Sequence, residues 1–172
     1  IATTHPLAAV AGLSALQNGG NAVDAAVTAA FTLAVVEPFN TGLGGDMFAL
    51  TWSNKDKRVR AINGSGPAPA AATIAEMRRR GISESIPETG WLPVTIPGAV
   101  GGLGTLLSEQ GTMSFEEVLH PAIRYADKGY PVPQVMAQQW QDSEPLLSST
   151  QEACDQYLFN GKAPRSGELV RL

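Results

Sequence analysis

The sequence predicts an α+β fold that is rich in helices, and three features of the chain support this prediction. Residues 22–36 are almost entirely apolar, which is typical of a helix that is buried on nearly every side. Residues 47–62 contain two short apolar runs around a polar turn, which predicts a β-hairpin. Further segments carry helix start and stop signals. Two or three strands do not make an independent sheet, so we expect the remaining strands to come from sequence outside this chain.

The N-terminal segment predicts two consecutive helices. Pro6 suits the first position of a helix that runs to about residue 18, and Gly19-Gly20 can end it because glycine tolerates a left-handed cap. Asn21 caps the second helix, and Asp24 lies where an acidic side chain complements the helix dipole. The polar residues of this helix are spaced four apart and share one stripe: Asp24, Thr28 and Thr32.

The middle of the chain predicts the hairpin and the loops around it. A glycine-rich loop at residues 40–46 precedes two strands, which we expect at 47–52 and 58–62. Residues 63–69 are too rich in Gly and Pro for regular structure. The elements expected beyond them are a short helix, a short strand and a longer helix: 73–80, 94–96 and about 99–109.

The last third of the chain predicts two more helices and then becomes weakly patterned. Ser114 and Glu117 form a capping box that opens a helix, and Gly129 can end it. Residues 134–142 are a further helix candidate. Beyond about residue 143 the pattern is weak, although residues 157–161 resemble a small apolar anchor before a turn.

Composition bounds the class of protein. With 44% hydrophobic residues in 172, the chain can bury a core, and we expect a single partial domain over residues 1–172 without an internal boundary. The net charge of −4 disfavours nucleic acid and anionic membranes as partners, and the basic run at Arg78–Arg80 is expected to be a solvated helix end. The longest apolar run is shorter than the ~20 residues that span a bilayer. The chain begins at Ile1 and shows no signal peptide, which indicates a processed or trimmed product and leaves the compartment open between cytoplasmic and periplasmic.

The residues alone suggest alternatives but no complete catalytic set. The glycines at 42–45 and 98–104 partly match a phosphate-binding fingerprint, but their spacing is wrong, and close helix packing through small residues explains the second segment equally. Cys154 with His5 or His120 is an open candidate for a nucleophile pair. The histidines and the cysteine have no metal-ligand spacing, so we expect neither a metal nor a cofactor.

Eight segments carry motifs in a fixed order along the chain. These motifs are His5–Ala8, Gly19–Ala26, Val36–Pro38, Gly42–Asp46, Ala68–Thr73, Val94–Gly98, Gly111–Met113 and His120–Ala122. Together they resemble the γ-glutamyltransferase (γ-glutamyltranspeptidase) family, and the resemblance covers essentially the whole chain. The Gly-Asn-Ala-Val-Asp segment is highly specific, and the ordered set is more so.

The resemblance implies an N-terminal-nucleophile hydrolase with a four-layer αββα sandwich, of which this chain is the helix-rich N-terminal part of the large subunit. It implies a proenzyme that cleaves itself, and a threonine at the start of the small subunit that attacks an amide and forms an acyl-enzyme. The acyl group then passes to water or to an amine. We therefore expect a small-molecule amide substrate, a downstream small subunit as partner, and no catalytic residue in this chain, and we leave open a homo-oligomer.

One substrate-binding residue of the family should fall within this chain. The resemblance places an arginine, which pairs with the α-carboxylate of a γ-glutamyl group, four residues before Pro69. Ser65 stands at that position. Serine can form hydrogen bonds but lacks the charge and length of arginine. Arg58 or Arg60 on the preceding strand could supply the missing charge.

The resemblance thus predicts an acyl pocket lined here by Asn63, Ser65 and Gly66. The loop is similar to the γ-glutamyltransferase-like branch of the family. The first function it implies is a glutathione hydrolase-type amidohydrolase or acyltransferase. The alternatives are a non-γ-glutamyl amide hydrolase of acylase or oxamate-amidohydrolase type, a non-catalytic fragment, and a dinucleotide-binding domain built on the glycines at 98–104.

Overall fold

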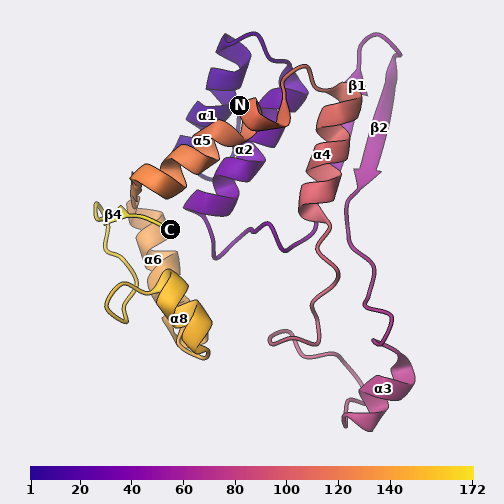
Figure 1. Ribbon diagram of the computed structural model, residues 1–172, viewed down its shortest axis with the longest axis vertical. Coiled ribbons are helices and arrows are strands. Elements are labelled where there is room, and N and C mark those ends of the chain that lie inside the picture. Colours follow the sequence, from indigo (N-terminus) through magenta and orange to yellow (C-terminus); the bar gives the residue numbers. More distant parts are fainter. The chain divides into compact units, whose positions relative to one another are not determined.

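The computed structural model describes residues 1–172 and contains eight helices and two antiparallel sheets of two strands each. The chain divides into two compact units (Figure 1). The helical unit combines Ile1–Gly42 with Leu107–Leu172, and the hairpin unit comprises Leu43–Leu106. This content agrees with the predicted α+β class. The four-layer sandwich and the single partial domain stay predictions.

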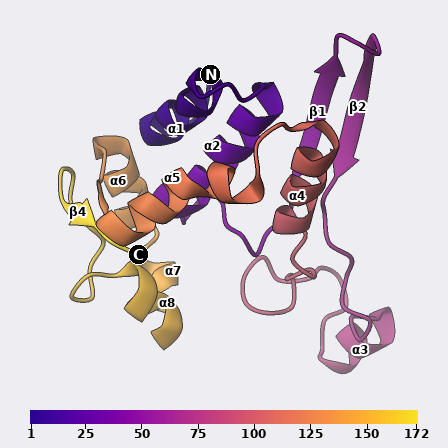
Figure 2. The ribbon, with the colours of Figure 1, turned by 45° about the horizontal axis from the view of Figure 1, so that its top comes forward.

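Three helices form the main layer of the helical unit, as Figure 2 shows. They are α1 (Pro6–Gln17), α2 (Ala22–Val36) and α5 (Phe115–Lys128). The central helix, α2, packs against both of the others. On the α5 side, the rings of Phe31 and Phe115 meet edge to face with their centroids 5.5 Å apart. Small alanines bring α1 and α2 together, and Ala8, Ala11 and Ala25 are buried there.

Local capping residues set the ends of these helices, as predicted. The Nδ1 atom of His5 accepts a backbone N–H at 3.1 Å to cap α1, with Pro6 in the first turn. Gly19, at φ +90°, takes the left-handed conformation after α1. Ser114 opens α5 through the predicted capping box, and Gly129, at φ +82°, ends it.

Asp24 joins the start of α2 to the loop before α5. Its carboxylate accepts the amide hydrogen of Asn21 at 2.7 Å, the amide hydrogens of Thr112 and Met113 at 2.9 and 3.0 Å, and the Thr112 hydroxyl at 2.6 Å. Burial alone would raise the pKa of the Asp24 carboxyl, but the bonds from the Thr112 side chain and the three amides outweigh burial and lower that pKa. Asp24 is therefore a tertiary anchor, beyond its predicted role at the helix dipole.

The polar stripe of α2 is buried, but the helix as a whole is not. The hydroxyls of Thr28 and Thr32 donate to the carbonyl groups four residues earlier, at 2.7 and 2.8 Å, and both side chains are almost fully buried. Ala22 and Ala26 on another face are exposed. The prediction of burial on nearly every side was wrong for this face, because α1 and α5 cover other sides of the helix.

The chain after α5 folds around Trp140. Its elements are β3 (Tyr130–Pro131), α6 (Gln134–Asp142), α7 (Glu144–Leu147), α8 (Gln151–Tyr157) and β4 (Leu169–Val170), with β3 paired to β4. Trp140 is 1% exposed, and its indole N–H donates to the carbonyl oxygen of Tyr157 at 2.9 Å. The predicted helix at 134–142 and the turn at 157–161 are confirmed, with Leu158 buried and positive φ angles at Asn160 and Gly161.

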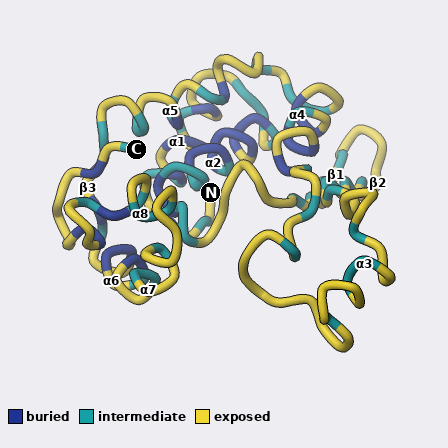
Figure 3. Tube along the Cα trace, turned by 60° about the horizontal axis from the view of Figure 1, so that its bottom comes forward, coloured by how far each residue is buried: buried dark blue, intermediate teal, exposed yellow.

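The hairpin unit contains the predicted hairpin and two helices. These elements are β1 (Phe48–Ser53), β2 (Arg58–Asn63), α3 (Ile74–Arg79) and α4 (Ala99–Gln110), whose last turn belongs to the helical unit. The two strands are antiparallel. Three of their four ends differ from the predicted bounds by one residue, and the start of β2 agrees. Side chains on one face of the hairpin are apolar yet 60–78% exposed: Phe48, Leu50, Trp52 and Val59. Figure 3 shows the contrast between this largely exposed hairpin and the helices of the other unit, which contain buried residues.

Two other predictions have mixed outcomes. Residues 94–96 form no strand, since Ile96 makes a single backbone bond, to the Pro67 carbonyl oxygen at 3.0 Å. The basic run is a solvated helix end, as predicted: the guanidinium groups of Arg79 and then Arg80 pair with Glu76 and lower the pKa of Glu76 to about 2. No helix in the structure has the length and apolar character needed to cross a membrane.

Candidate functional site

The predicted site residues lie where three loops of the hairpin unit meet. We call this region the three-loop junction and define it as Gly45–Asp46, Asn63–Gly66 and Thr95–Gly98. The hairpin register pairs Phe48 with Asn63, so the loop before β1 and the loop after β2 leave the hairpin side by side. The pairing continues one step further, because the Gly64 amide donates to the Met47 carbonyl oxygen at 2.8 Å.

The first loop is bonded to both of the others. The Oδ1 atom of Asp46 accepts the amide hydrogen of Gly66 at 2.9 Å and the hydroxyl hydrogen of Thr95 at 3.3 Å. The carbonyl oxygen of Gly45 accepts the amide hydrogens of Gly98 and Ala99 at 3.1 and 2.9 Å. A single turn of chain therefore fixes the loop after β2 and also caps the start of α4.

The backbones of the second and third loops are in direct contact. A Cβ atom added at Gly66 would overlap the carbonyl oxygen of Ile96, and one added at Gly98 would overlap the carbonyl oxygen of Gly64. Close packing explains Gly98 in the glycine-rich segment at 98–104, and also Gly102, where an added Cβ atom would meet Met47. The dinucleotide alternative is disfavoured, because Gly45 already occupies two of the N–H groups, those of Gly98 and Ala99, that a phosphate at the start of α4 would use.

The structure brings Asn63, Ser65 and Gly66 together in a tight turn. The Oδ1 atom of Asn63 accepts the amide hydrogen of Ser65 at 2.9 Å, and the next amide, that of Gly66, donates to Asp46. The peptide groups on both sides of Ser65 are thus held. Its side chain is exposed, and its hydroxyl forms no hydrogen bond within the chain. Such a turn can present the hydroxyl to a ligand.

The structure lends no support to the suggestion that an arginine of β2 replaces the missing charge. The guanidinium group of Arg60 pairs with Asp56 in the hairpin turn at 2.7 Å, at the opposite end of the strand from Ser65. Arg58 is further still, opposite Ser53, and at ~3.3 Å per residue it lies about 16 Å along the strand from Asn63. The ion pair with Asp56 therefore holds the guanidinium group of Arg60 away from the three-loop junction.

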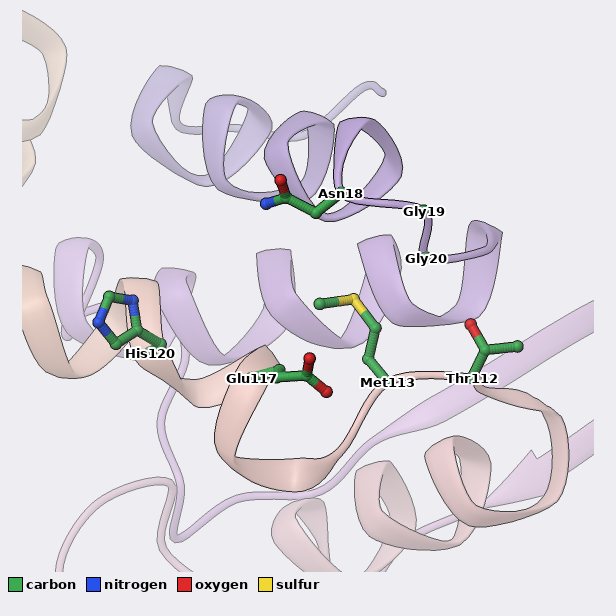
Figure 4. A pocket seen from close by; sticks show the side chains of 7 residues that line it. All are labelled: Asn18, Gly19, Gly20, Thr112, Met113, Glu117 and His120. Atoms are coloured by element: carbon green, nitrogen blue, oxygen red, sulfur yellow. The ribbon is translucent and has the colours of Figure 1, made fainter.

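A second concave region lies in the helical unit, where the α1–α2 turn faces the start of α5 (Figure 4). Its volume is about 460 Å³, and it is lined by Asn18, Gly19, Gly20, Thr112, Met113, Glu117 and His120. The Glu117 carboxylate is engaged in the capping box, where bonds from the backbone N–H and the hydroxyl of Ser114 lower its pKa. Asn18 and Thr112 are bonded within the chain, to Ser14 and Asp24, and no group of three metal-ligating side chains exists in the chain.

The cysteine and the histidines do not form a nucleophile pair. Cys154 packs against the Trp140 core, and no hydrogen bond joins it to a histidine. His5 is fully buried, and burial lowers its pKa while its Nδ1 atom caps α1. These residues are parts of the fold.

Comparisons with known proteins identify the family of this chain. The sequence matches the family model "Gamma-glutamyltranspeptidase" over residues 8–172. It is 37% identical to the glutathione hydrolase proenzyme of Bacillus subtilis (strain 168) over 99% of this chain and 29% of that protein. It is 39% identical to the glutathione hydrolase-like YwrD proenzyme of the same strain over 98% of this chain and 32% of that protein. The crystal structure of cephalosporin acylase from Bacillus halodurans matches with a TM-score of 0.92 and 40% identity, over 98% of this chain and 32% of that chain.

These similarities define a class of hydrolases and acylases, in which the two glutathione hydrolase relatives are proenzymes. This chain belongs to the gamma-glutamyltranspeptidase family. The resemblance found in the sequence motifs is thereby confirmed. The chain spans 29–32% of the length of these three relatives, all of which are longer proteins.

Proposed function

We propose that this chain is the N-terminal part of a γ-glutamyltransferase-like amidohydrolase that works by acyl transfer. The observation that carries the proposal is the family match over residues 8–172. The amide carbonyl of a small substrate would be attacked by a threonine hydroxyl on a small subunit encoded downstream. The leaving amine would depart, and water or a second amine would take the acyl group from the threonine ester.

In this proposal the three-loop junction forms one wall of the acyl pocket. Asn63, Ser65 and Gly66 would line it, and two features support this role. Both peptide groups beside Ser65 are held by side-chain carboxamide or carboxylate oxygens, and the Ser65 hydroxyl is exposed and unbonded. A fixed backbone with a free polar group is suited to orienting a substrate.

A second candidate is an amide hydrolase whose acyl group is not γ-glutamyl. It is favoured by Ser65 at the position of the expected arginine, and by the pairing of Arg60 with Asp56. A charged hydrogen bond is worth about 1.5–3 kcal/mol, so loss of the arginine would weaken binding of an α-carboxylate by ten-fold or more. The similarity to an acylase at 40% identity supports the same candidate.

The test uses the full-length gene product. A gel reports self-cleavage, and an amide-hydrolysis screen compares a γ-glutamyl anilide with glutaryl, oxamate and simple acyl amides. We expect cleavage into two subunits and activity on an amide that lacks the γ-glutamyl α-carboxylate. Strong γ-glutamyl activity would retain the first candidate and reject the second. The absence of both cleavage and activity would favour a non-catalytic protein.

The substitution Ser65→Arg tests the site itself. We expect it to raise kcat/KM on γ-glutamyl amides by about ten-fold or more, since a guanidinium group would regain the carboxylate contact. Ser166→Arg, at an exposed position in the helical unit, is the matched control and should change nothing. A folded Ser65→Arg protein with no gain would show that this loop does not face the acyl group.

A further inference from the structure

Asp46 provides the side-chain carboxylate that joins the three-loop junction. Its Oδ1 atom receives one hydrogen bond from the loop after β2 and one from the loop before α4, across sequence separations of 20 and 49 residues. None of the ion pairs in the chain includes Asp46, and its side chain is exposed. A carboxylate without a cationic partner, bonded only to an amide and a hydroxyl, keeps its second oxygen available.

The bond from Gly66 to Asp46 determines how Ser65 is presented. Asn63 holds the amide that precedes the Ser65 Cα atom, and Asp46 holds the amide that follows it. With both peptide planes fixed, the Cα–Cβ bond of Ser65 has one direction. Without Asp46, the peptide between Ser65 and Gly66 would lose its only side-chain hydrogen bond, and the hydroxyl would sample several directions.

We propose that Asp46 is a positioning residue of the acyl site, which orients Ser65 by holding the Gly66 amide. This inference rests on the proposed function for its catalytic readout. The chain keeps other contacts around the loop that do not need the carboxylate. The Met47–Gly64 backbone pair and the capping of α4 by Gly45 remain when the side chain is removed. We therefore expect Asp46 variants to fold while the Ser65 turn loosens.

The experiment compares Asp46→Ala with Asp46→Asn in the full-length protein. Asparagine retains an Oδ1 acceptor for the Gly66 amide, whereas alanine retains none. KM and kcat are measured on the amide that the wild-type protein cleaves best. Hydrogen exchange of a peptide covering residues 63–67 gives a readout that does not need catalysis. The matched control is Asp155→Ala, which removes an exposed carboxylate that accepts a hydrogen bond from Gln151 in the helical unit.

We expect Asp46→Ala to raise KM by about ten-fold, with a smaller change in kcat, and to speed exchange at 63–67. Asp46→Asn should stay within about three-fold of wild type in KM, and Asp155→Ala should change neither readout. Unchanged exchange and KM in Asp46→Ala would overturn the inference. Equal losses in the alanine and asparagine variants would overturn it as well, because they would assign the effect to charge. If the wild-type protein cleaves no amide but Asp46→Ala still speeds exchange at 63–67, the result would support the orienting contact and reject the proposed function.

Discussion

Removing the Asp24 carboxylate should destabilise the helical unit by several kilocalories per mole. The side chain accepts four hydrogen bonds of 2.6–3.0 Å and is fully buried. At about 1 kcal/mol for each bond, Asp24→Ala would cost about 4 kcal/mol. Thr112 is exposed, so water can replace part of that loss, and we expect about 3–4 kcal/mol. Asp24→Asn should cost about half as much, because the asparagine Oδ1 atom keeps the bonds from the Thr112 and Met113 amides while its NH2 group faces the other two donors.

Urea unfolding of the full-length protein, followed by circular dichroism, measures this cost. The pKa of the Asp24 carboxyl is lowered in the folded state, so its contribution is complete above the ordinary carboxyl pKa of about 4. The contribution should fade as the pH drops through the lower folded-state value. The difference in unfolding free energy between wild type and Asp24→Asn should therefore be largest near pH 7 and shrink below about pH 4.

The control for this prediction is Glu109→Ala, which removes an exposed carboxylate near the end of α4. It should change the free energy of unfolding by less than about 0.5 kcal/mol. An Asp24→Ala midpoint equal to that of the control, or a difference that does not depend on pH, would refute the reasoning from buried hydrogen bonds.

Three further substitutions test other contacts. Gly66→Ala should reduce amide hydrolysis by at least ten-fold in a steady-state assay, because the new methyl group would overlap the Ile96 carbonyl oxygen; wild-type activity would show that the two loops are apart. Ser114→Ala should lower the free energy of urea unfolding by about 1 kcal/mol through loss of the α5 cap, and an unchanged midpoint would contradict the cap. Trp140→Phe should lower it by about 1–3 kcal/mol, because the Tyr157 carbonyl oxygen loses its indole donor; a loss below 0.5 kcal/mol would mean that water replaces the bond.

The helices that the sequence predicted well are those with local signals. Asn21, Ser114 and Gly129 act on backbone groups within one turn, so their roles follow from neighbouring residues alone. The pairing of β3 with β4 was not predicted, because it joins Tyr130 to Val170 across 40 positions of weakly patterned chain. Such short strands depend on tertiary packing, here against the Trp140 core.

The same distinction applies to the candidate site. The family resemblance identified Asn63, Ser65 and Gly66, but not Asp46, whose bonding partners are distant in sequence. The signal available in the sequence was the position of Asp46 at the end of the glycine-rich loop at residues 40–46. The suggested role of Arg60 in the site stays a prediction, although the guanidinium group of Arg60 pairs with Asp56, a partner only four residues away in the hairpin turn.

The helical unit is discontinuous, and this has a consequence for how the chain is synthesised. The last residue of α2, Val36, leaves the ribosome 92 positions before Lys128, the last residue of α5. At ~5–20 residues per second, α2 waits roughly 5–18 seconds for the helix that covers it. During that interval the apolar side of the nascent helix is open to chaperones and to neighbouring chains. The hairpin unit is made entirely within this interval, so its length sets how long α2 stays uncovered.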